Sequence, residues 1–135
     1  MIEPRSVLDA SALIAHIRRE PGYLMVESAM ADGATISLVN YAEVLARLGD
    51  AGQDADAVDR RLRDEGMIGG LLRFEPFLEA DALTSARLRG ATRSRGLSLG
   101  DRACLALALR LGLPALTTDR AWAALAVGVD VQVIR

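Results

Sequence analysis

The chain has 135 residues, of which 51% are hydrophobic, and it carries a formal net charge of −2. This length suits a single domain over residues 1–135 with a core of its own, and the apolar content excludes a disordered chain. The small negative charge excludes a broad surface for binding polyanions, but it leaves room for a local basic rim. All 16 basic residues are arginine, which excludes catalytic, Schiff-base and P-loop lysines.

A lone cysteine and the lack of long apolar runs set further limits. Cys104 excludes an intramolecular disulfide and a Cys-rich zinc site, and its Ala- and Leu-rich surroundings predict a buried packing role. No apolar run is long enough to span a bilayer, and no signal peptide precedes the first predicted strand. We therefore expect a cytoplasmic protein that does not bind a membrane.

The first part of the chain alternates strands with helices. Pro21 and Gly22 separate two helices, and the dipeptide at 32–33, Asp-Gly, is a turn signal before a buried strand. In chain order we expect a strand at 5–8, helices at 10–19 and 22–31, a strand at 34–39 and a helix at 40–48.

The remainder of the chain continues this alternation. We expect a charged helix at 54–65, a strand at 71–75, helices at 77–90 and 101–111, a strand at 115–118, a short helix around Trp122 and an edge strand at 129–134. Strands that alternate with helices are typical of an α/β fold. The pattern predicts a three-layer α/β/α sandwich with a mostly parallel central sheet.

Four carboxylates follow apolar runs or begin the helices after them: Asp9, Glu43, Asp101 and Asp119. The carboxyl ends of parallel strands share one edge of the sheet, where ligands bind, so we expect the four side chains to meet there. Their mutual repulsion requires a cation, and hard divalent ions prefer oxygen ligands. The pattern predicts a Mg²⁺ or Mn²⁺ site that directs water at a phosphodiester, which is the chemistry of a nuclease.

Each acid also has an interpretation as a helix cap. Asp9 and Asp119 are suited to cap the helices that follow them, and Asp101 is suited to close a capping box. Asn40 and Glu43 have the spacing of another capping box. Capping alone does not require four acids behind apolar runs at one sheet edge, so the joint pattern favours the metal site.

Polar neighbours of the acids have two interpretations each. The hydroxyls of Ser11 and Thr118 would orient a ligand water or a phosphate, or they would make only local bonds at helix starts. Asn40 would either cap a helix or support Glu43. A group of arginines over 87–95 would contact substrate phosphates beside the site, or it would be a solvated helix end.

Four segments together resemble the PIN-domain ribonucleases, and most of all the VapC toxins of bacterial toxin–antitoxin pairs. They are DASALIA from Asp9, NYAEV from Asn40, LSLGDRACLALA over 97–108 and LTTDRAW over 116–122. The third segment is the most distinctive, and the ordered set covers nearly the whole chain.

The resemblance carries specific expectations. By position, the family's four acids match Asp9, Glu43, Asp101 and Asp119, and its usual hydroxyl matches Ser11. It implies a Mg²⁺- or Mn²⁺-dependent endoribonuclease that forms a homodimer and binds a cognate antitoxin, which blocks the site. It does not choose among transfer, ribosomal and messenger RNA as the substrate.

Two other functions compete with the nuclease. A Mg²⁺-dependent phosphatase or phosphotransfer domain of the haloacid-dehalogenase type needs a second aspartate where this chain has Ser11, and a receiver domain needs a lysine, which the chain lacks. A PIN-like scaffold that binds RNA or protein without cutting remains open, although the complete acid set argues against it.

Overall fold

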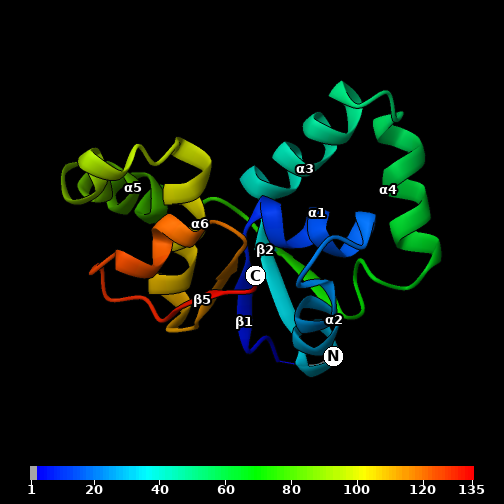
Figure 1. Cartoon of the computed structure of the whole chain (residues 1–135), viewed down its shortest axis with the longest axis horizontal. Coiled ribbons are helices and arrows are strands. Elements are labelled where there is room, and N and C mark those ends of the chain that lie inside the picture. Colours follow the sequence, from blue (N-terminus) through cyan, green and yellow to red (C-terminus); the bar gives the residue numbers. More distant parts are fainter. Residues whose placement is uncertain (1–2) are drawn as a thin grey trace.

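The computed structural model describes residues 3–135 and has an α/β fold (Figure 1). Its sheet has five strands in the order β3-β2-β1-β4-β5, and every neighbouring pair is parallel. The strands are β1 (Ser6–Leu8), β2 (Ala34–Ser37), β3 (Leu72–Glu75), β4 (Ala115–Thr117) and β5 (Val131–Val133). The predicted parallel sheet and the edge position of the last strand are therefore confirmed.

The helices follow the predicted order, although several begin at other residues. They are α1 (Ala10–Arg18), α2 (Tyr23–Asp32), α3 (Leu38–Asp50), α4 (Ala55–Asp64), α5 (Glu79–Thr92) and α6 (Leu99–Leu111), with short 3₁₀ helices η1 (Arg93–Arg95) and η2 (Arg120–Ala124). None of the helices in residues 3–135 has the length and apolar character needed to cross a membrane.

The start of α3 differs from the prediction. We expected this helix to begin at Asn40, but it begins at Leu38, because the Ser37 hydroxyl accepts a hydrogen bond from the amide of Val39 and caps it. Strand β2 thus passes into α3 without a loop. Asn40 lies inside the first turn, where its side chain is free to contact another element.

Two hydrophobic cores lie on opposite faces of the sheet and create the three layers. Successive strand residues point to opposite faces, so Leu8 and Leu116 pack with α1 to α4, whereas Val7 and Ala115 pack with α5 and α6. In Figure 1 the first four helices and the last two accordingly lie on either side of the strands. The predicted three-layer sandwich is confirmed.

The strand order contains a point where the direction of winding reverses. From β1 the chain moves outward to β2 and β3, then returns through α5 and α6 to place β4 on the other side of β1. At such a reversal a crevice forms beyond the carboxyl ends of the two strands that flank it, which are β1 and β4 here. The residues that follow β1 and β4 are therefore the first place to look for a functional site.

Candidate active site

A cavity of about 410 Å³ lies at this carboxyl edge. It brings together all four predicted acids, each from a different part of the fold: Asp9 follows β1, Glu43 is in α3, Asp101 is in the first turn of α6 and Asp119 follows β4. The residues that line the cavity are Asp9, Ala10, Ser11, Glu43, Arg47, Ser98, Asp101, Thr118 and Asp119. We call this cavity the acid pocket.

Asp9 is the most buried of the four acids, at 5% exposure. One oxygen, Oδ1, accepts hydrogen bonds from Ser11 Oγ at 2.7 Å and from the Ala12 amide at 2.8 Å, and Oδ2 accepts one from Thr117 Oγ1 at 2.6 Å. Burial raises the pKa of this carboxyl from 3.8 to about 6, although the three hydrogen bonds oppose the rise and the nearby Asp101 adds to it. A bound cation would favour the charged form that burial disfavours.

Glu43 is held by a contact between α3 and α6. The Asn40 side-chain amide donates to Glu43 Oε1 at 2.8 Å and to the backbone carbonyl of Gly100 at 2.9 Å. The alternative interpretation of Asn40 and Glu43 as a capping box is wrong, because Glu43 accepts from the side-chain amide of Asn40 and Ser37 is the residue that caps α3. Asn40 therefore fixes the Glu43 carboxylate against the start of α6.

Gly100 makes this approach possible. A Cβ atom at this position would overlap the Glu43 carboxylate, so only glycine leaves room for it without a shift. Arg47, one helical turn after Glu43, is a loose partner, with Nη2 3.8 Å from Glu43 Oε2 and a side chain that is 52% exposed. Within residues 3–135, it is the only cationic side chain that lines the acid pocket.

Three of the acids cap helices and line the pocket at once. Asp9 caps α1, Asp119 Oδ1 accepts from the Ala121 amide at 2.9 Å to cap η2, and Asp101 Oδ2 accepts from the Ser98 amide at 3.0 Å in a capping box. The capping and site interpretations are therefore compatible for these residues, because a carboxylate has more acceptor positions than one cap uses.

Thr117 was missed in the sequence analysis. Its hydroxyl donates to Asp9 and accepts from the Asp119 amide at 3.1 Å, so it ties two pocket acids together. Ser11 Oγ accepts from the backbone amide of Thr118 at 3.0 Å, so Thr118 contributes through its main chain. No local sequence signal marks Thr117, because it lies beside Asp9 only through the pairing of β1 with β4.

Comparison with protein families decides the identity of the fold. The sequence profile of the PIN domain matches residues 6–128. The chain belongs to the PIN domain family. Comparison with curated protein sequences finds no significant match.

Solved structures resemble this PIN domain over nearly its full length. A toxin–antitoxin complex from Klebsiella pneumoniae aligns with a TM-score of 0.69 at 20% identity, covering 94% of this chain and 95% of the other. FitAcB from Neisseria gonorrhoeae gives 0.69 at 23% identity, covering 93% and 95%. VapC20 from Mycobacterium tuberculosis, described as a Sarcin-Ricin loop cleaving toxin, gives 0.71 at 16% identity, covering 94% and 98%. At these identities the likeness concerns the fold.

The acid pocket of this PIN domain fits a hard divalent cation in the kind and charge of its donors. Besides burial, the negative charges of Asp9, Asp101 and Glu43 raise the pKa of the Cys104 thiol inside α6, so the potentials of the three acids overlap there. Among residues 3–135, no three carboxylate, imidazole or thiol groups stand at ready metal-binding spacing. The pocket is therefore suited to a divalent cation by its four carboxylates and their excess of negative charge over Arg47, and not by ligands already placed around an ion.

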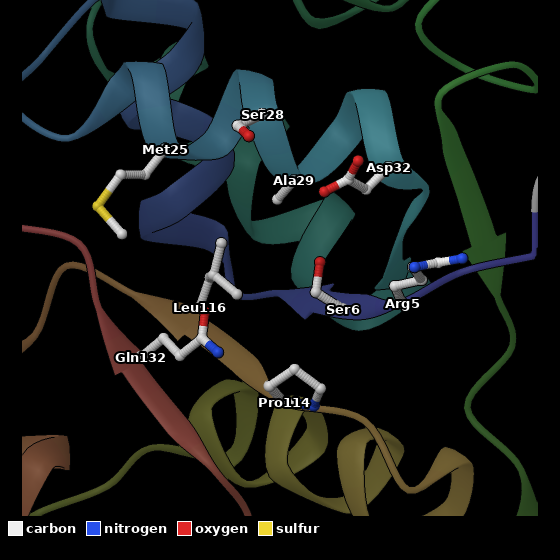
Figure 2. Close-up of a pocket in the computed structure, with 9 residues that line it drawn as sticks. All are labelled: Arg5, Ser6, Met25, Ser28, Ala29, Asp32, Pro114, Leu116 and Gln132. Atoms are coloured by element: carbon white, nitrogen blue, oxygen red, sulfur yellow. The ribbon is translucent and has the colours of Figure 1, made fainter.

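A second cavity of this PIN domain does not share that chemistry. It measures about 290 Å³ and lies between α2 and strands β1, β4 and β5. Figure 2 shows Arg5 and Asp32 toward one end and Met25 toward the other. One carboxylate and one guanidinium balance each other here, so the cavity has no excess of negative charge to attract a divalent cation.

Proposed function

We propose that this PIN domain is a Mg²⁺- or Mn²⁺-dependent endoribonuclease and the toxin of a toxin–antitoxin pair. The observation that carries the proposal is that Asp9, Glu43, Asp101 and Asp119, from four separate elements, line one pocket where the winding of the sheet reverses. Carboxylates gathered at such a crevice are suited to hold a divalent cation and a phosphodiester together.

Each polar residue has a defined part in this proposal. The four acids would hold the cation, and the cation would supply neutralisation of phosphate charge and a lower pKa for an attacking water. Ser11 and Thr117 fix both oxygens of Asp9, and Asn40 fixes Glu43. Outer hydrogen bonds of this kind orient ligands and are worth about 10- to 100-fold in affinity or activity.

The toxin role rests on the likeness to known toxins. The similar structures include a toxin–antitoxin complex and a toxin described as cleaving the Sarcin-Ricin loop. We accordingly propose an antitoxin protein as the partner, RNA as the substrate and a homodimer as the assembly, all within the single domain formed by residues 1–135.

Cleavage of structured RNA tests the enzymatic part. The wild-type protein should cut RNA only with Mg²⁺ or Mn²⁺, and Asp9→Asn and Asp101→Asn should each reduce the rate by about 100-fold or more, since each removes a charge that stabilises the reaction. Asp56→Asn, which changes an exposed acid in α4, is the matched control and should cut normally. Cleavage that is unchanged in both pocket variants would refute the assignment.

Two further outcomes separate the alternatives. RNA binding without cleavage at any metal concentration would favour a non-catalytic RNA-binding PIN scaffold over the nuclease. Expression without an antitoxin tests the toxin role, because wild type should arrest growth and Asp9→Asn should relieve the arrest. Cleavage in vitro with no arrest of growth would retain the nuclease and reject the toxin.

A further inference from the structure

Exposed arginines gather in the second half of α5 and in the segment that leads into α6, a stretch of sequence with no acidic residue. No aspartate or glutamate lies between Asp81 and Asp101 in the sequence. The same stretch carries four exposed arginines: Arg87, Arg89, Arg93 and Arg95. We call these four residues the arginine group. In a chain of net charge −2, residues 82–100 thus carry four positive charges and no negative one.

The arginine group has no partners within residues 3–135. None of the four guanidinium groups forms an ion pair or a side-chain hydrogen bond in this part of the chain. The arginines of α4 differ, because Arg63 pairs with Asp59 at 2.8 Å and Arg61 with Glu65 at 4.0 Å. Solvation of a helix end explains a single exposed arginine. It does not explain four exposed arginines within a stretch that contains no aspartate or glutamate.

The group lies directly beside the acid pocket along the chain. A hollow of about 190 Å³ is lined by Arg89, Thr92, Arg93, Gly96 and Leu97. The next residue after Leu97 is Ser98, which lines the acid pocket. Consecutive Cα atoms are only about 3.8 Å apart, so the backbone that lines this hollow continues directly into the backbone that lines the acid pocket.

The backbone turns at Gly96 to make this connection. Gly96 has a φ of 66°, a left-handed conformation that ends η1 and that glycine adopts without strain. The chain then enters the capping box of α6, which carries Asp101. The arginine-bearing segment is thus linked to a pocket acid by a short, capped connection.

We propose that the arginine group binds backbone phosphates of the RNA on one side of the cleavage position. The inference rests on the proposed nuclease function and adds to it a binding subsite with named residues. Four carboxylates face one arginine in the acid pocket, so a polyanion approaching it is repelled unless positive charge lies nearby. Arginine suits this task because its planar guanidinium binds phosphate oxygens in pairs.

The salt dependence of RNA binding tests the proposal without requiring cleavage. A labelled single-stranded RNA is titrated with each protein in EDTA over a range of KCl concentrations. For single strands, the slope of log K against log salt is about −0.7 for each phosphate neutralised. The double variant Arg93→Gln/Arg95→Gln should therefore flatten the slope by about 1.4.

Two matched variants distinguish the arginine group from general charge. Arg61→Gln/Arg63→Gln removes the same charge from α4 and should leave the slope unchanged. Arg93→Lys/Arg95→Lys keeps the charge and should keep most of the slope. Because the four glutamine positions are exposed, thermal denaturation should show folded proteins throughout.

The results separate this inference from the nuclease proposal. A wild-type slope in Arg93→Gln/Arg95→Gln, an equal flattening in the α4 variant, or no RNA binding by the wild type would each overturn the subsite. If the wild type cleaves RNA while the slope is unaffected by the arginine group, the nuclease stands and the subsite fails. If the slope flattens as expected but no metal supports cleavage, the subsite stands and the nuclease fails.

Discussion

Without metal, the Asp9→Asn variant should be more stable relative to wild type at higher pH than at lower pH. Burial raises the pKa of Asp9 from 3.8 to about 6. An acid whose folded pKa lies above its unfolded pKa binds its proton more tightly in the folded state. Stability is therefore lost as the pH rises from about 4 to about 6, and the whole loss is present above that window.

The size of the effect follows from the two pKa values. At about 1.4 kcal/mol per pKa unit, the charged Asp9 lowers the unfolding free energy by about 3 kcal/mol at neutral pH. About 2 kcal/mol of this loss develops between about pH 4.5 and about pH 7.5. Asparagine at position 9 does not titrate, so the variant should gain about 2 kcal/mol relative to wild type over this interval.

Urea unfolding in EDTA at the two pH values measures the gain. Asparagine disturbs the hydrogen bond with Thr117, but that loss is the same at both pH values and cancels from the comparison. Asp56→Asn, on the solvent-exposed side of α4, should follow wild type at both. A stability difference between Asp9→Asn and wild type that does not change with pH would refute the reasoning.

Three more outcomes follow from the same contacts. Thr117→Val should lower RNA cleavage by about 10- to 100-fold because Asp9 loses a donor, whereas Thr118→Val should have less effect, since Thr118 contacts Ser11 through its backbone. Gly100→Ala should lower the rate of RNA cleavage by about 100-fold, because the added Cβ displaces the Glu43 carboxylate. Gly90→Ala is its control, because a Cβ at that position meets open space. Mg²⁺ at 100 times its dissociation constant should add about 2.7 kcal/mol to the unfolding free energy of wild type in chemical denaturation, and this gain should be much smaller in Asp9→Asn.

The sequence predicted the layers and the position of the acids because both depend on local patterns. Apolar runs that alternate with helices indicate a parallel sheet, and an acid directly after such a run must lie at its carboxyl edge. What could not be predicted depends on tertiary pairing. The Thr117 hydroxyl meets Asp9 across a sequence separation of 108 residues, only because β4 lies beside β1.

The error at Asn40 has a different physical origin. Residues 34–40 mix apolar and small polar side chains and contain no glycine or proline, so nothing in the pattern marks where the strand ends and the helix begins. The Ser37 hydroxyl decides where α3 begins, because it caps the helix by accepting a hydrogen bond from the Val39 amide. The role of Asn40 in joining α3 to Gly100 then depends on how two layers dock, which no local pattern encodes.

The central position of β1 has a consequence for a chain that is still being made. Asp9 is synthesised well before its neighbouring strand β4 and the hydroxyl that holds its carboxylate, which come more than a hundred residues later. A nascent chain that has folded only through α4 lacks both Asp101 and Asp119. The ribosome would therefore make β4 and the residues after it before the four pocket acids of any copy could come together.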